Sequence, residues 1–77
     1  MLIVNREKCE AVNLDTAYRL NLEMENSSQY TLQAELVSSG LRIASVIARY
    51  DKIEDAIREF NRILDAYAAD RRVYWIG

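Results

Sequence analysis

The sequence predicts an α+β domain: an antiparallel β-meander of about five strands, one long C-terminal amphipathic helix packed on one face, and a short terminal strand. Three observations carry this prediction. Apolar and polar residues alternate over 17–25 and again over 30–37, as in half-buried strands. From residue 51 the apolar spacing changes to the helical period. Residues 73–76 are all bulky strand-forming types. At 77 residues, the chain fits one small domain spanning 1–77.

The first two expected strands are short. Residues 2–4 are apolar, and the polar stretch 5–8 predicts a turn before a second strand over 9–12. Asn13 and Asp15 then favour another turn, because their side chains bond the nearby backbone.

The third and fourth strands, 17–25 and 30–37, form a predicted hairpin. If Glu25 faces Gln29, apolar residues of the two strands face one another on the core side, and one ion pair forms on the solvent side. Those pairs are Leu20–Ala34, Leu22–Leu32 and Arg19–Glu35.

The fifth strand, 41–50, is apolar on both faces, and its orientation depends on the turn at 38–40. A two-residue turn directs Ile43 and Ile47 inward. A three-residue turn with a bulge at Gly40 directs the other face inward, which carries Ala44, Val46 and Tyr50.

The helix is expected to begin near Asp51, with Asp51 and Glu54 forming an acidic variant of a capping box. Its apolar residues form one stripe of seven positions. They are Ile53, Ala56, Ile57, Phe60, Ile63, Leu64 and Tyr67. The terminal strand 73–76 should then dock on a sheet edge or on a partner.

The composition argues against an enzyme. Histidine is absent and Cys9 is the single cysteine, so we expect no catalytic, cofactor or metal site. Cys9 is interpreted as a half-buried strand thiol. An unpaired cysteine, together with the lack of a signal peptide, favours a reducing cytoplasm. No apolar run approaches the length of a membrane span, so no membrane association is expected.

More apolar surface is expected than one helix can cover, which predicts a homodimer or a protein partner. The contact would involve the outer face of the meander, around Val37, Arg42 and Val46, or the terminal strand 73–76. The candidate residues are Val37, Arg42, Val46, Arg71, Arg72 and Trp75. The alternative is a small nucleic-acid-binding domain that uses Arg71, Arg72 and Trp75. Nucleic acid is disfavoured, because the net charge is −2 and the expected outer face carries both signs.

The order of features resembles that of small uncharacterised α+β proteins of Gram-positive bacteria and their phages and mobile elements. The shared features are Val12-Asn13-Leu14-Asp15, the meander, Tyr50-Asp51 before a helix with Ala56, and the final aromatic strand. The resemblance implies a bacterial or phage source and no assigned activity. The expected function is therefore a non-catalytic protein-interaction module, either an accessory subunit or a phage-type inhibitor or adaptor that binds a host protein.

Overall fold

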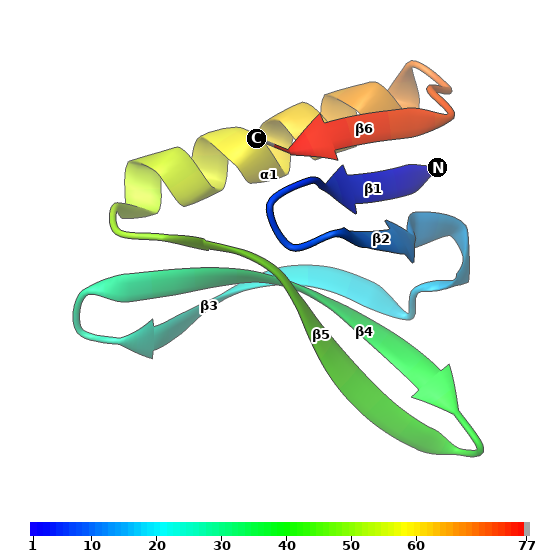
Figure 1. The fold of residues 1–77 in the computed structure, drawn as a ribbon, viewed down its shortest axis with the longest axis horizontal. Coiled ribbons are helices and arrows are strands. Elements are labelled where there is room, and N and C mark those ends of the chain that lie inside the picture. The colour runs from blue at the N-terminus through cyan, green and yellow to red at the C-terminus, as the bar shows by residue number, and fades with distance from the viewer. Residues whose placement is uncertain (77) are drawn as a thin grey trace.

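A computed structural model describes residues 1–76 as two three-stranded sheets and one helix (Figure 1). The α+β class predicted from the sequence is confirmed, and the helix precedes the final strand. The elements in chain order are β1 (Leu2–Asn5), β2 (Glu10–Asn13), the short 3₁₀ helix η1 (Leu14–Thr16), β3 (Arg19–Asn26), β4 (Gln29–Ser38), β5 (Leu41–Tyr50), α1 (Ile53–Ala68) and β6 (Val73–Ile76).

The first sheet has the order β2-β1-β6. β1 is antiparallel to β2 and parallel to β6, with Leu2 opposite Val73 and Asn5 opposite Ile76. A parallel pair needs a long crossover connection, which here contains the second sheet and α1. The terminal strand therefore docks on the edge of this sheet.

The second sheet, β3-β4-β5, is antiparallel. The three pairs predicted from alternation, namely Arg19–Glu35, Leu20–Ala34 and Leu22–Leu32, are all present. Arg19 Nε lies 3.3 Å from Glu35 Oε2. The hairpin end differs, because Asn26 rather than Glu25 faces Gln29 and the register shifts after Met24.

The turn between β4 and β5 has two residues, Ser39 and Gly40, with φ values of 51° and 79°. Two successive positive φ values suit the twist of a tight hairpin. A register shift lies opposite Leu32 and Gln33, so that Ile47 and the adjacent Ala48 are both buried. Ile43 is exposed instead of buried, so neither orientation considered for this strand holds along its whole length.

The prediction of one five-strand meander is wrong, because the strands divide between two sheets. The break lies at η1, where the Asn13 side chain accepts a hydrogen bond from the Asp15 N–H and the Leu14 N–H bonds the Met1 carbonyl. This turn redirects the chain after β2, so β3 pairs with β4 alone.

The helix is rotated relative to the predicted stripe. Ala56 and Ile63 of the stripe are buried, as is Ala66, which lies outside the stripe. The other apolar side chains of the stripe are half-buried or exposed. The two alanines allow the helix backbone to approach β3, β4 and β5 closely. The exposed members of the stripe are Ile53, Ile57, Leu64 and Tyr67.

The predicted capping box at Asp51 and Glu54 is also wrong. The N-cap is Lys52, which makes no side-chain hydrogen bond to the helix. Asp51 lies one residue earlier and is exposed, since β5 extends to Tyr50 and leaves only two residues for the connection. Glu54 and Asp55 in the first turn still suit the positive end of the helix dipole.

The core lies between the two sheets and α1. Ile3 and Val12 come from the first sheet, Leu32 from the second and Ile63 from the helix. The chain thus has one common core, and the sheet faces turned away from it are available for other roles.

Candidate functional site

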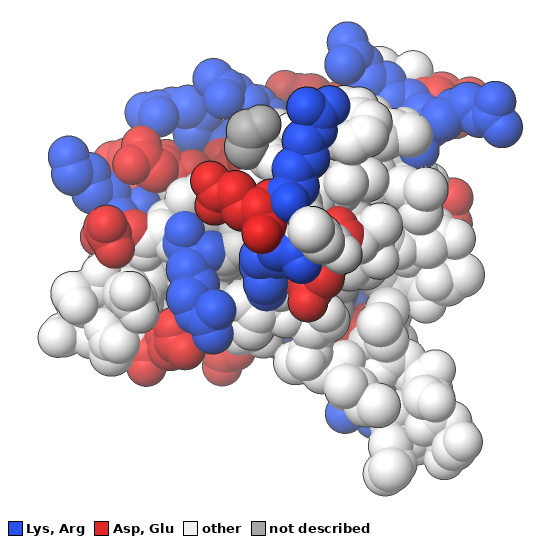
Figure 2. Space-filling view, in the orientation of Figure 1, with Lys and Arg blue, Asp and Glu red and all other residues white. Residues whose placement is uncertain are grey.

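The outer face of β1 and β6, turned away from the core, carries four apolar side chains that are exposed or half-buried. Alternation along β1 buries Ile3 and Asn5 and turns Leu2 and Val4 outward. Their partners on β6, Val73 and Trp75, point to the same side. Trp75 is 53% exposed and Leu2 42% exposed. We call these four residues the outer sheet face. Figure 2 shows mostly uncharged surface toward the right-hand ends of β1 and β6, and charged side chains in front of their left-hand ends.

Arg6 lies over Trp75. Its guanidinium carbon is 4.2 Å from the centroid of the indole ring, which is a cation–π contact. Arg6 follows β1 directly, and the parallel pairing of β1 with β6 brings the two residues together. The sequence offered no local signal for this pair, because 68 positions separate them.

Arg71 and Arg72 lie before the start of β6, and Trp75 lies near its end. The predicted basic–aromatic cluster is therefore different in composition: Arg6, and neither Arg71 nor Arg72, stacks on Trp75. Both arginines line a hollow of about 830 Å³ that Asp15 and Asp70 also line. This end of the sheet consequently carries both signs of charge.

The other three predicted residues lie on the second sheet. Val37 and Arg42 face each other across β4 and β5, and both are exposed. Arg42 stacks on the ring of Tyr18 at 4.2 Å and donates a hydrogen bond to its hydroxyl. Val46 is half-buried beside the register shift, and its carbonyl accepts a hydrogen bond from Lys8 Nζ. The structure therefore brings together Val37 and Arg42, with Val46 farther along the strand.

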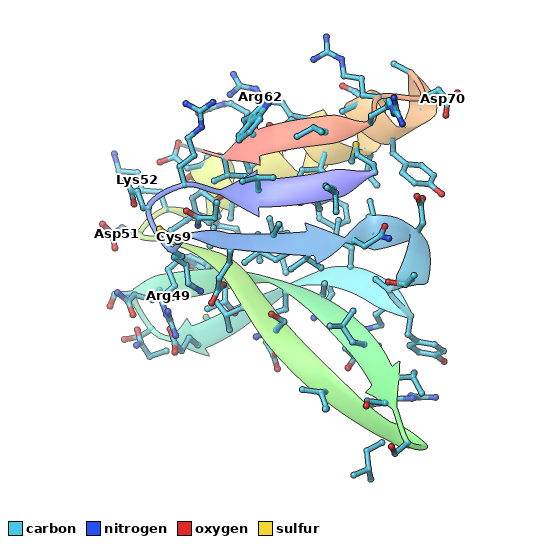
Figure 3. The ribbon with its side chains drawn as sticks, turned by 45° about the vertical axis from the view of Figure 1, so that its right-hand side comes forward. Cys9, Arg49, Asp51, Lys52, Arg62 and Asp70 are labelled. Carbon is cyan, nitrogen blue, oxygen red and sulfur yellow. The ribbon has the colours of Figure 1, made fainter. Side chains whose placement is uncertain are left out.

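Cys9 does not lie in a strand. It occupies the turn between β1 and β2 with φ of 54°, and its side chain is exposed. Figure 3 shows it at the end of the sheet opposite Asp70. The expectation of a half-buried strand thiol is therefore wrong, because β2 begins one residue later, at Glu10.

A polar cluster joins α1 to the two sheets. Glu59 accepts hydrogen bonds from Tyr74 Oη at 2.5 Å and from Tyr50 Oη at 3.4 Å. Burial and the nearby Glu59 carboxylate raise the pKa of Tyr50 well above its usual range, and burial with the Glu59 hydrogen bond raises the pKa of Tyr74 to about 12. Both phenols act as hydrogen-bond donors that join α1 to the two sheets.

Among residues 1–76, no group of three or more histidine, cysteine or acidic side chains is placed to hold a metal ion. The single α-helix in this part of the chain is too short and too polar to cross a membrane.

Comparison of the chain with protein-family models, curated proteins and solved structures finds no match.

Proposed function

We propose that this protein is a non-catalytic protein-interaction module of bacterial or phage origin, acting as an accessory subunit or as an inhibitor or adaptor that binds a host protein. The observation that carries the proposal is the outer sheet face. On this face Leu2 and Trp75 are exposed beside the half-buried Val4 and Val73, on a domain with a modest core. A contiguous exposed apolar patch of this kind marks an interaction surface.

The composition of the face favours a protein partner. Tryptophan and arginine are enriched in protein–protein interfaces, and here an exposed tryptophan lies beside aliphatic side chains with an arginine at the rim. Trp75 supplies the large anchor, and Arg6 holds one face of its ring in a fixed orientation. A partner with a complementary apolar pocket would bury Trp75 and leave Arg6 at the wet margin.

Nucleic-acid binding is the second candidate, because Trp75 is exposed and four cations lie near the first sheet. They are Arg6, Lys8, Arg71 and Arg72. Two observations make nucleic-acid binding less favoured than protein binding. Arg6 already occupies one face of the ring on which a base would stack. Acidic residues alternate with these cations along the chain, namely Glu7, Glu10 and Asp70.

A non-catalytic role is supported by the most organised polar cluster, because the hydroxyls of Tyr50 and Tyr74 both donate hydrogen bonds to Glu59 and so join the helix to the two sheets. Cys9 is exposed and unpaired, which suits a reducing cytoplasm.

Affinity capture tests this function. Wild-type protein, Trp75→Ala and a matched control, Met24→Ala, are used as baits in nuclease-treated lysate of a Gram-positive bacterium. Met24 is as exposed as Trp75 but lies on β3, in the other sheet. We expect mass spectrometry to find a protein retained by wild type and Met24→Ala and lost with Trp75→Ala. Equal recovery with all three baits, or recovery that disappears on nuclease treatment, would contradict the proposal.

A further inference from the structure

The β4–β5 hairpin projects from the body of the molecule (Figure 1). β3 pairs with β4 only as far as Arg19 opposite Glu35, whereas β4 and β5 continue pairing to Ser38 opposite Leu41. Residues 36–38 and 41–43 therefore form a two-stranded arm. A two-stranded hairpin without a third strand or a covering helix is marginally stable in water.

The arm is unusually apolar for an exposed hairpin. On the face that continues the core, Leu36 is half-buried, while Leu41 and Ile43 are 68% and 52% exposed. Arg42 is the only charged residue between positions 36 and 44. Its guanidinium is already engaged with Tyr18. The arm thus lacks the charges that normally protect a sheet edge from pairing.

The free edge of β5 presents backbone groups in a regular order. Ser38 faces Leu41 across the two-residue turn, and such a pair is hydrogen-bonded. Alternation then directs the N–H and C=O groups of Arg42 and Ala44 away from β4. The same alternation turns the Val46 carbonyl outward, in agreement with its bond to Lys8 Nζ.

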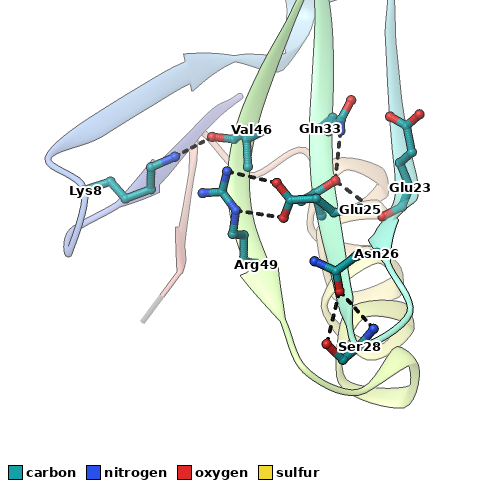
Figure 4. Close-up of polar contacts among 9 residues, drawn as sticks. Lys8, Glu23, Glu25, Asn26, Ser28, Gln33, Val46 and Arg49 are labelled. Carbon is teal, nitrogen blue, oxygen red and sulfur yellow. Dashed lines mark hydrogen bonds and ion pairs between the residues drawn. The ribbon is translucent and has the colours of Figure 1, made fainter.

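The proximal half of this edge is blocked. Lys8 Nζ donates to the Val46 carbonyl at 2.6 Å, and Asn5 Nδ2 donates to the Ile47 carbonyl at 2.7 Å (Figure 4 shows the Lys8 contact). The bulge at Ile47 bends the strand at the same place. Within residues 1–76, no side chain caps the carbonyls of Arg42 or Ala44. The protein protects half of the edge and leaves the distal half open.

We propose that the distal edge of β5 pairs with β5 of a second copy, antiparallel about a twofold axis at Ile43. In this register Arg42 faces Ala44 of the other copy. The two pairs exchange four backbone hydrogen bonds. The arms join into one continuous six-stranded sheet, which is an isologous and closed contact.

The side chains of β5 suit this register. Ile43 meets its own copy on the apolar face, where Leu36 and Leu41 of both arms lie beside it. On the other face Arg42 lies opposite an alanine, so no like charges are paired. The β5 edge of a second copy is therefore complementary to this edge in its hydrogen bonds, its apolar contacts and its charge.

The surface area agrees with a small interface. The protein exposes 5309 Å². A compact monomer of this mass is expected to expose about 4,800 Å², and the excess of about 500 Å² matches a projecting arm. Edge pairing of two short arms would bury less than the roughly 800 Å² per subunit of a standard complex, so we expect a weak, micromolar dimer.

This inference is independent of the partner proposed for the outer sheet face, which lies in the other sheet. The sequence suggested a dimer contact either through the face of the second sheet around Val37, Arg42 and Val46 or through the terminal strand 73–76, and the edge contact differs from both. In the sheet-face contact, the arms would stack face to face; here, they join edge to edge.

Cysteine cross-linking tests the register. In a Cys9→Ser background, Ile43→Cys places two thiols in a facing pair that is not hydrogen-bonded, where Cα atoms are about 4.5 Å apart and a disulfide is possible. Leu41→Cys is the matched control on the same face. Its two copies would lie roughly 13 Å apart along the strands. With diamide, we expect a disulfide-linked dimer from Ile43→Cys and little from Leu41→Cys; equal yields, or none from Ile43→Cys, would overturn the proposal.

Sedimentation equilibrium at micromolar concentrations tests the edge itself. Ala44→Pro removes an outward N–H that makes no bond to β4, so the arm should remain folded. Circular dichroism checks this. We expect Ala44→Pro to weaken the dimer at least tenfold and the control Val37→Asp to leave it unchanged. A wild-type protein that is monomeric throughout, or a dimer that Val37→Asp dissociates and Ala44→Pro does not, would refute edge pairing.

Discussion

Ile63→Ala tests how the helix is seated on the core. Ile63 is fully buried, while Ile57, on the same helix, is 45% exposed. The mutation removes three carbons, worth about 2.4 kcal/mol of transfer free energy, and leaves a cavity. The total loss should be about 3–4 kcal/mol. That is a large part of the roughly 4–12 kcal/mol expected for a domain of this length.

Ile57→Ala is the matched control, because the chemical change is identical. Ile57 contributes little buried surface, and alanine is the better helix former, so the loss should stay below about 1 kcal/mol. Urea unfolding followed by circular dichroism, at one low protein concentration, measures both values. Equal losses would show that both side chains are buried, as in the stripe predicted from the sequence, and would refute the observed rotation.

Three further predictions concern the helix start, the tyrosine cluster and the cysteine. Asp51→Ala should change the free energy of unfolding by less than about 0.5 kcal/mol, whereas Lys52→Ser should add about 1 kcal/mol by supplying the missing cap; the reverse order in urea melts would restore Asp51 as the cap. Because the pKa of Tyr74 is raised to about 12, its contribution to stability should be complete below its unfolded pKa of about 10 and be lost as the pH rises through 12. Glu59→Gln should lower the phenol pKa values in an ultraviolet titration, though not fully, since burial is their largest cause; unchanged values would exclude the Glu59 contribution. Cys9→Ser should leave unfolding and partner capture unchanged, because the thiol is exposed in a turn, and a folded variant that no longer captures the partner would contradict this.

The local parts of the fold could be predicted from the sequence. Strict alternation indicated which faces of the two strands meet, since a slip of one residue would turn every apolar side chain outward. The expected tight turn then selected the pairing of Leu22 with Leu32 and of Arg19 with Glu35. The helix position followed from its period. These features depend on neighbours within a few residues or across one tight hairpin.

The remaining features depend on contacts between distant segments. The division into two sheets follows from the turn at η1 and from the parallel docking of β6 on β1, which no local pattern encodes. The Arg6–Trp75 contact arises from that same docking. The apolar stripe of the helix was too broad to show which side faces the core. The small side chains of Ala56 and Ala66 are buried, whereas the larger and more hydrophobic Ile57 and Leu64 are exposed.

Most of the candidate residues are exposed, and their interaction role stays a prediction. Trp75 and Val37 are exposed, as an interaction role requires, and Val37 lies opposite Arg42. Arg71 and Arg72 lie away from the Trp75 ring, and the open edge at Ala44 was missed. An edge is a property of sheet order, and sheet order was the part of the fold that the sequence left open.

Site-specific photo-crosslinking tests the central claim, that the outer sheet face binds another protein. A photoreactive amino acid replaces Val73, which lies on this face, or Met24, which is exposed on the other sheet. After irradiation in nuclease-treated bacterial lysate, we predict a discrete protein adduct from position 73 and none of the same mass from position 24. Adducts that are identical at both positions, or none from position 73, would contradict the claim.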